Sequence, residues 1–469
     1  MNSGESVLLK VPRMLPGLDP LFRPAALGVQ AYQQAAASSP TQVSMEFSLE
    51  RNQGRIYRGQ TLLISSEPSP DTLRYVERLV KFLLWQVGGW KLTVAGPQPV
   101  VEFLKKSYAT GGIRQFDARM MEDAYGHPFE VVAVKNAAEL PSANESTDLL
   151  GGHTQGCRLG FDLGASDYKL SAVRDGEAVF TTEIPWDPKI QPDPEWHFAR
   201  IQEGLKLAAS HLPRVDAIGG SSAGIILDNE VRVASLFRAV PKPLFQEKGR
   251  TIFHRIQRAW NVPLEVANDG DVTSLAGGMS LGVDAILGIA MGSSLAAGWR
   301  DEKGRILGWL NELAFVPVDY HPDGPIDEWS QDRGCGVQFF SQQAVVRLAG
   351  PAGISLPPGH PAEQLKHVQE LHAKGDARAA QIFESIGVAF GYSVALFAMY
   401  YPGLKHVLTL GRVTSGQGGE CILSKAKAAL ELEFPALASR IQFHIPDEKN
   451  KRHGQAVAAA SLPFLSLRA

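Results

Sequence analysis

Apolar and polar residues along the first third of the chain follow two periods, which together predict a small α/β unit. Residues 44–64 alternate with period two around an Asn-Gln-Gly turn at 52–54, which predicts a β-hairpin. Residues 72–87 carry a helical apolar pattern between a Ser-Pro-Asp start and a Gly-Gly stop. A strand, a helix and a second strand are then predicted at 91–96, 97–109 and 128–135.

Beyond a polar linker at 136–156, short apolar strands alternate with helices. Strands are predicted at 157–164, 168–175, 178–184 and 215–224, and a helix is predicted at 195–211. The pattern recurs after residue 281, with strands predicted at 284–292, 294–301, 304–309 and 405–413 and long helices before the last strand. This order predicts mixed sheets with ligand loops at the strand ends, arranged as two lobes around a cleft. Residues 1–40, rich in Pro, Ala and Gln, are predicted to be loosely structured.

Length, charge and cysteine content exclude several classes of protein. A chain of 469 residues corresponds to about three domains. The net charge of −3 argues against general nucleic-acid binding. Three cysteines cannot form a disulfide framework, and their spacing offers no CxxC pair for zinc. The first residues lack the apolar core of a secretory signal, and the most apolar stretches, such as LVKFLLWQVGG, are too short or too interrupted to cross a membrane. We therefore expect a soluble, cytoplasmic protein.

A candidate phosphate-binding turn follows the strand predicted at 157–164. Residues 162–169 read Asp-Leu-Gly-Ala-Ser-Asp-Tyr-Lys. The backbone amides of such a turn, with a serine hydroxyl, can hold phosphate oxygens. Asp162, at the strand end, could orient Mg²⁺ through its water shell. An ordinary hairpin with a glycine turn is the alternative interpretation.

Three further turns are candidate ligand loops. Small residues at 221–224, Ser-Ser-Ala-Gly, would let a ligand approach the backbone, although a plain strand-to-loop turn explains them as well. Residues 291–298 form a strand-turn-strand segment that could be a second phosphate loop or a simple hairpin. Residues 410–416 follow an apolar strand and could pack against an adenine or a ribose, with a Gly-Ser loop as the alternative.

An Asn-Asp pair and a glutamate offer the chemistry that phosphoryl transfer to a hydroxyl needs. Asn268 could orient a polyol through its amide, and the carboxylate of Asp269 could accept a hydroxyl proton. The alternative is a helix N-cap, for which Asp271 is the better placed carboxylate. Glu312 lies in an apolar segment, where a carboxylate needs a partner or a function such as accepting sugar hydroxyls. A surface position on a short helix is the alternative for Glu312.

The order and spacing of these motifs resemble the ROK family of sugar kinases and regulators, in the actin-like ATPase superfamily. The resemblance covers about residues 158–465. DLGASDYK resembles the family's first phosphate motif, ANDGD its catalytic segment, AMGSSLAAG its second phosphate loop and GWLNELAF its sugar-binding segment. SSAG, together with NEVRVASLF, resembles the family's sugar loop, and RGCGVQFFSQQAV resembles the helix after its zinc loop. TLGRVTSG resembles its adenosine motif, and GQAVAAASL resembles its closing helix.

The resemblance implies an α/β fold of the two-lobed, actin-like (ribonuclease H-like) type, with an additional small N-terminal α/β domain. It divides the chain into an accessory domain at 1–150, a first lobe at 151–285 and a second lobe at 286–469. The final helix, near 455–466, is expected to pack back towards the first lobe. The accessory domain resembles no family, and could complete the sugar cleft, make an oligomer contact such as that of a homodimer, or cap the catalytic lobe.

The resemblance also implies a reaction, in which ATP transfers its γ-phosphate to a hydroxyl of a hexose or amino sugar. Asp269 would be the base that deprotonates this hydroxyl, and Asp162 would position Mg²⁺ through water. The positions implied for sugar binding are Asn268, Asp269, Asn311, Glu312, Ala223 and Gly224. The positions implied for ATP binding are Asp162, Gly164, Ala165, Ser166, Lys169, Gly292, Ser293, Ser294, Gly411 and Arg412. Closure of the lobes would limit wasteful hydrolysis.

The sequence departs from the family's pattern at several positions. Phe315 stands where the family has a zinc-ligating histidine, and Cys335 alone remains of its cysteine loop, so no structural zinc is expected. Ala267 stands where the family commonly has glutamate. Three residues of the second phosphate loop replace glycines and narrow the room for phosphates: Ser294, Ala296 and Ala297.

Two alternative functions follow from these departures. A non-catalytic sugar sensor or regulator of the same family would bind sugar without measurable affinity for ATP. An ATPase of the same superfamily that acts on a non-sugar substrate would hydrolyse ATP whether or not sugar is present. The first 150 residues lack a clear basic recognition helix, so no nucleic-acid partner is expected.

Overall fold

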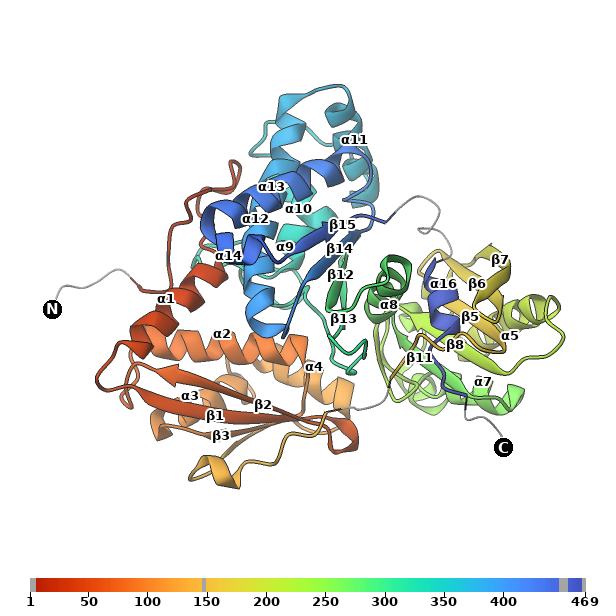
Figure 1. Cartoon of the computed structure of the whole chain (residues 1–469), viewed down its shortest axis with the longest axis horizontal. Coiled ribbons are helices and arrows are strands. Elements are labelled where there is room, and N and C mark those ends of the chain that lie inside the picture. The colour runs from red at the N-terminus through yellow and green to blue at the C-terminus, as the bar shows by residue number, and fades with distance from the viewer. Residues whose placement is uncertain (1–5, 146–148, 447–453, 466–469) are drawn as a thin grey trace.

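The N-terminal third of the chain forms a four-stranded sheet in the order β2-β1-β3-β4 in the computed structural model, which describes residues 6–145, 149–446 and 454–465 (Figure 1). The predicted hairpin is confirmed as β1 (Val43–Glu50) and β2 (Ile56–Leu63), paired antiparallel. β3 (Lys91–Ala95) pairs antiparallel with β1, and β4 (Glu130–Ala133) pairs parallel with β3. The helices of this unit are α2 (Pro70–Gln86), α3 (Gln98–Tyr108) and α4 (Gln115–Tyr125).

The prediction of loose structure for residues 1–40 is wrong for residues 25–37, whereas the described residues before them form turns and irregular backbone. The helix is α1 (Ala25–Ala37), which packs against α12 (Ala377–Tyr400) of the second lobe. α1 lacks a side-chain N-cap and a strongly amphipathic pattern, so its sequence carries little helix signal. Its small apolar residues are instead buried against a neighbouring helix, and this tertiary packing stabilises a segment that would not be helical alone.

The first lobe is built on a five-stranded sheet in the order β11-β8-β5-β6-β7. Its strands are β5 (Cys157–Leu163), β6 (Asp167–Arg174), β7 (Glu177–Pro185), β8 (Ala217–Ser222) and β11 (Leu264–Asn268). β5, β8 and β11 run parallel, so their carboxyl ends meet at one edge, where ligand loops are expected. The remaining elements are α5 (Pro194–Ala209), β9 (Ile225–Leu227), β10 (Glu230–Val233), α6 (Lys242–Leu244) and α7 (Ile252–Trp260).

A late helix returns to this sheet. α16 (Gly454–Ala460) contacts β5, β6 and β8 (Figure 1). Two glycines permit the close approach: a Cβ at Gly160 would lie 1.8 Å from the carbonyl oxygen of Ala456, and a Cβ at Gly219 would lie 1.7 Å from that of Ala459. Part of the glycine content of the chain therefore serves backbone packing between helix and sheet.

The second lobe is built on a sheet in the order β13-β12-β14-β15. Its strands are β12 (Ile286–Met291), β13 (Leu295–Arg300), β14 (His406–Leu410) and β15 (Gln442–His444). Its further helices are α9 (Val337–Phe340), α10 (Gln342–Ala349), α11 (Pro361–Ala373), α13 (Gln417–Glu433) and α14 (Pro435–Ala438). The strand predicted at 304–309 is wrong, because Gly304 and Gly308 adopt φ of +73° and +65° and interrupt the extended backbone. α12 has the length and hydropathy of a membrane span, but it is mostly buried as a core helix.

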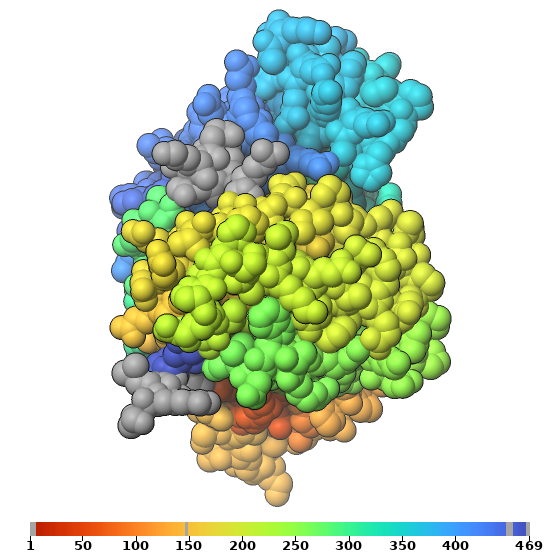
Figure 2. Space-filling view, turned by 90° about the vertical axis from the view of Figure 1, so that its right-hand side faces the viewer, coloured from red at the N-terminus to blue at the C-terminus, as the bar shows by residue number. Residues whose placement is uncertain are grey.

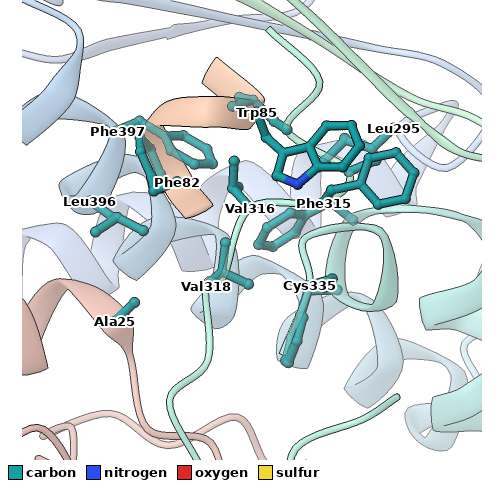
Figure 3. Packing of buried hydrophobic residues seen from close by; sticks show 14 of the residues in the cluster. Ala25, Phe82, Trp85, Leu295, Phe315, Val316, Val318, Cys335, Leu396 and Phe397 are labelled. Carbon is teal, nitrogen blue, oxygen red and sulfur yellow. The ribbon is translucent and has the colours of Figure 1, made fainter. Parts of the chain in front are cut away.

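Three hydrophobic clusters of unequal size lie among the described residues. The largest is shared by the N-terminal unit and the second lobe, a second belongs to the first lobe, and a small third one joins α8 to α16. In the shared core, Phe82 and Trp85 of α2 lie among Phe315, Leu396 and Phe397 of the second lobe (Figure 3). Trp85 stacks on Phe315 with ring centroids 4.2 Å apart. Figure 2 shows the first lobe in front, with the N-terminal unit below it and the second lobe above.

Candidate functional site

The junction between β11 and α8 (Asp269–Leu281) places Asn268 and Asp269 at the carboxyl edge of the first-lobe sheet. The Asn268 amide caps the helix, because its Oδ1 accepts from the Gly270 backbone N–H at 2.7 Å while its Nδ2 donates to the Gly224 carbonyl at 2.6 Å. Asp269 is the first helical residue, and its carboxylate accepts from the same Gly270 amide at 3.0 Å. The prediction that Asp271 is the better placed cap is wrong, because the helix begins two residues earlier.

The predicted phosphate-binding turn lies at the same edge. Near the end of β5, Asp162 accepts a hydrogen bond of 2.7 Å from the Ser221 hydroxyl, and the Lys169 ammonium lies 3.6 Å from its second oxygen. Lys169 also contacts Asp167 at 2.9 Å, and Ser166 donates to Asp167 at 3.0 Å. The turn therefore presents an ammonium, a hydroxyl and backbone amides beside a buried carboxylate.

Four buried carboxyl groups lie near this edge, and burial is the largest cause of the raised pKa of each. Burial raises the pKa of Asp162, with partial compensation by Lys169. Burial, and secondly the charge of Asp162, raise the pKa of Asp269 to about 7. Burial also raises the pKa of Asp271 to about 7, and that of Glu312 to about 8 with the charges of Asp269 and Asp271 contributing. Such clusters of perturbed carboxyl groups are typical of functional sites.

The segment that carries Glu312 is a loop held by α2, not a short surface helix. The Asn311 backbone amide donates to the carbonyl of Gln86 at 2.9 Å, and the Glu312 amide donates to that of Trp85 at 2.8 Å. The Asn311 side chain donates to Asp271 at 3.0 Å and accepts from the Tyr401 hydroxyl at 2.9 Å.

A cavity of about 630 Å³ opens beside these residues. Asn268 and Asp271 line one side of it, and the backbone of Gly224 is bonded to Asn268, which also places the neighbouring Ala223 close to this edge. Gly224 has a φ of +108°, and a Cβ there would lie 2.2 Å from the carbonyl oxygen of Val233, so this small-residue turn requires glycine.

The second lobe contributes two turns that the resemblance assigns to nucleotide binding. Residues 292–294, Gly-Ser-Ser, form a tight turn between β12 and β13 in which the Gly292 amide donates to the Ser294 carbonyl at 2.9 Å. Gly411, directly after β14, has a φ of +102°. It lies against the backbone of Met291, because a Cβ at Gly411 would be 2.4 Å from the carbonyl oxygen of Met291. Lys169 and Ser166 lower the pKa of Asp167, and the positive charge of Arg412 lowers it by a smaller amount.

The segment at the position of the family's zinc loop instead joins an ion cluster between α2, α4 and the second lobe. Asp332 contacts Arg114 at 2.7 Å, Arg78 at 2.8 Å and Lys81 at 3.2 Å. Six charged side chains form this ion cluster: Glu77, Arg78, Lys81, Arg114, Asp117 and Asp332. Burial raises the pKa of the nearby Cys335 thiol to about 11. Among the described residues, no three His, Cys, Asp or Glu side chains are grouped to hold a metal ion.

Several cavity residues carry no signal that sequence reasoning used. Arg51 and Tyr125 come from the N-terminal unit. Arg232 of β10 also lines the cavity, and it lies in the segment NEVRVASLF that resembles the family's sugar loop. Glu265 also lines the cavity, and burial raises its pKa to about 7. The period of two along β11 could have identified Glu265, because it places residues 265 and 267 on the same side of the strand.

Comparison with known proteins identifies the fold. No protein-family model matches the sequence, and no curated protein matches it. The structure is similar to a ROK hexokinase from Thermus thermophilus, at 17% identity and a TM-score of 0.52 over 66% of this chain and 97% of that chain. It is also similar to a ROK family glucokinase from Streptomyces griseus in complex with glucose and AMPPNP. The identity is 21% and the TM-score 0.50, over 66% of this chain and 99% of that chain.

A third similar structure is a ROK family transcriptional regulator, a homologue of the E. coli MLC protein. Its identity is 20% and its TM-score 0.51, over 70% of this chain and 81% of that chain. The three likenesses confirm the predicted two-lobed, actin-like α/β fold, and the chain has the fold of ROK proteins.

Proposed function

We propose that the chain is an ATP-dependent sugar kinase of the ROK family, with a hexose or amino sugar as acceptor. The observation that carries the proposal is the position of Asp269 at the edge of the parallel strands, with a pKa raised to about 7. Asp269 does not itself line the cavity, but it lies between Asn268 and Asp271, which do. A carboxylate whose pKa is near the working pH is suited to accept a hydroxyl proton. The likeness in fold to the two ROK kinases supports this assignment.

In the proposed reaction, the acceptor hydroxyl attacks the γ-phosphorus while its proton passes to the Asp269 carboxylate. A new oxygen–phosphorus bond forms, and the bond between the γ-phosphorus and the β,γ-bridging oxygen breaks, which releases ADP. Asn268 and Glu312 orient other hydroxyls of the acceptor. Asn311 acts through its hydrogen bond to Asp271, because this bond fixes the position of a carboxyl group that lines the cavity.

The nucleotide is proposed to lie between the two lobes. Gly164, Ala165, Ser166 and Lys169 would hold phosphate oxygens from one side, with Gly292, Ser293 and Ser294 opposite, and Gly411 and Arg412 near the nucleoside. A single buried carboxylate such as Asp162 fits Mg²⁺, because Mg²⁺ retains water and is commonly held by one or two carboxylates plus substrate phosphates. Bound Mg²⁺ would offset the negative charge of the phosphates.

ADP formation with a panel of hexoses and amino sugars tests the proposal. We expect Asp269→Asn to lower kcat/KM by roughly 10²–10⁴-fold, the usual contribution of a positioned base. Asp284→Asn, at a carboxylate whose side chain is 45% exposed, is the matched control and should leave activity unchanged. No ADP formation with any sugar, or an equally active Asp269→Asn variant, would contradict the proposal.

A non-catalytic sugar sensor is the second candidate, favoured by the second phosphate loop. Ala296 and Ala297 lie within β13 and pair with β12, so the open turn comprises residues 292–294. This candidate predicts sugar binding without ATP binding. Calorimetric titration with ATP and Mg²⁺ distinguishes the two, since heat of ATP binding is expected of a kinase alone.

A further inference from the structure

A second cavity lies where the N-terminal unit meets the second lobe, and it shares no lining residue with the cavity described above. Its volume is about 270 Å³. Arg74 and Arg78 line it from α2, where a spacing of four residues places both side chains on one face of the helix. Asp319, His321 and Arg333 line it from the second-lobe loop between β13 and α9. We call this cavity the junction pocket.

Two arginines of the junction pocket have no carboxylate within ion-pair distance among the described residues. Arg74 donates to the backbone carbonyl of Tyr320, and Arg333 donates to that of Gly324 at 2.9 Å. The Nε and Nη1 atoms of Arg74 make no hydrogen bond within the described part of the chain, and neither is fully buried, so both are available to a ligand. Burial, and secondly the charge of Arg78, lower the pKa of Arg74, as expected for a guanidinium without a counter-ion.

His321 adds a third donor to the junction pocket. Its Nδ1 accepts from the backbone amide of Asp323 at 3.0 Å, so the neutral ring carries its proton on Nε2. That Nε2–H has no acceptor among the residues that the structure describes. The junction pocket therefore presents two guanidinium groups, one from each wall, together with an imidazole N–H.

The carboxylates at the junction pocket are already engaged. Asp332 belongs to the ion cluster, whose three cations and three carboxylates balance. Asp319 accepts from the backbone amides of Arg23 and His321, each at 2.9 Å, and burial raises its pKa to about 6. Outside the neutral ion cluster, the pocket therefore holds two guanidinium groups against one carboxylate, and its net charge is positive.

The donors and the charge favour a small anion with several oxygens. A guanidinium fork matches the oxygens of a phosphate in a bidentate geometry. The volume lies below the roughly 300–1,000 Å³ of sites for drug-sized ligands, which suits a small ligand. We propose that the junction pocket binds a phosphate group, as inorganic phosphate or as a small phosphate monoester, and that this group bridges α2 and the second-lobe loop. The inference does not depend on the kinase proposal, because none of these residues belongs to the proposed acceptor or nucleotide site.

Calorimetric titration of the full chain with inorganic phosphate and with glucose 6-phosphate, at constant ionic strength, tests the inference. We expect at least one of them to bind, and the tighter of the two distinguishes free phosphate from a phosphate monoester. Arg333→Gln, at an exposed position, and Arg74→Gln should each weaken binding by roughly 10–100-fold, the usual range for one charge-assisted hydrogen bond. Bound phosphate should also raise the Tm of the parent chain, because it binds the folded state.

Arg258→Gln is the matched control. Arg258 is an exposed arginine of α7 without an ion pair among the described residues, and it does not line the junction pocket, so phosphate affinity should not change. Lys169→Gln separates the junction pocket from the predicted phosphate-binding turn at 162–169. No binding of either phosphate compound would overturn the inference. Binding that survives both Arg74→Gln and Arg333→Gln, or that only Lys169→Gln removes, would place the phosphate elsewhere and overturn it as well.

Discussion

The backbone amide of Glu312 donates to the carbonyl oxygen of Trp85 at 2.8 Å, which fixes the proposed sugar-binding carboxylate to the last turn of α2. The adjacent bond, from Asn311 to Gln86, is 2.9 Å long. The last carbonyls of a helix have no partner within the helix, so the loop and the helix end satisfy each other. The N-terminal unit therefore contributes to the position of a residue that is far from it in the chain.

Gly88→Ala should disturb both stability and sugar binding. Gly88 has a φ of +85°, and a Cβ there would lie 1.9 Å from the Tyr125 hydroxyl oxygen and 2.8 Å from Leu310 Cγ. Strain in the left-handed region and overpacking together should cost about 2–4 kcal/mol in unfolding free energy. Urea unfolding and sugar titration measure the two effects. Gly111→Ala is the control, because Gly111 has a similar φ of +78° but nothing within 4 Å of the new Cβ. Equal losses in the two variants would contradict this account.

The activity should rise with pH through neutrality. The pKa of Asp269 is raised to about 7, chiefly by burial, and the base must be deprotonated to accept a proton. We expect kcat/KM to increase as the pH rises through a midpoint near 7. A steady-state pH profile for the best acceptor sugar measures this, and a flat profile around neutrality would exclude Asp269 as the titrating base.

Glu312→Gln should stabilise the protein more at alkaline than at acidic pH. The folded-state pKa of Glu312 is raised to about 8, above the value of an unfolded glutamate, so its stability contribution is present at low pH and is lost as the pH rises through about 8. A glutamine cannot ionise and escapes this loss, while sugar affinity should fall. Thermal unfolding of the variant and the parent on both sides of that pKa measures the difference, and the exposed Glu420→Gln should show no such trend. A constant Tm difference would be inconsistent with a buried, titrating Glu312.

Asp332→Asn should be strongly destabilising. Its carboxylate contacts Arg78, Lys81 and Arg114, and breaking one member of a buried ion cluster typically costs about 3–5 kcal/mol. These cations hold the pKa of Asp332 well below its usual range, so its contribution is present above the unfolded pKa and is lost as the pH falls towards the folded value. Chemical denaturation at neutral pH measures the loss. Glu328→Gln, an exposed position in the same loop, should change little, and a comparably small effect of Asp332→Asn would show that the cluster is dispensable.

The regular periodic segments of this fold could be predicted from the sequence, whereas contacts between distant segments could not. The hairpin around residues 52–54 carries a period of two in its first strand and an Asn-Gln-Gly turn, and its prediction is correct. Taking Asp271 as the helix cap places the start of α8 too late in the chain. The first turn of the helix is polar and faces the cleft, so the apolar pattern does not identify Asn268 as the cap. The cavity combines residues from 51 to 310, and no local pattern links a hairpin arginine to a tryptophan on another lobe.

The shared core has a consequence for synthesis of the chain on the ribosome. Leu8 and Ile441 belong to the same core, whereas the main core of the first lobe is formed by residues between Leu159 and Val266, and only a small cluster with α8 waits for α16. At about 5–20 residues per second, the apolar face of the N-terminal unit waits on the order of tens of seconds for its partner helices to emerge. The main core in the middle of the polypeptide can therefore assemble before the core that contains the beginning of the chain, and the apolar face of the N-terminal unit stays uncovered during that interval.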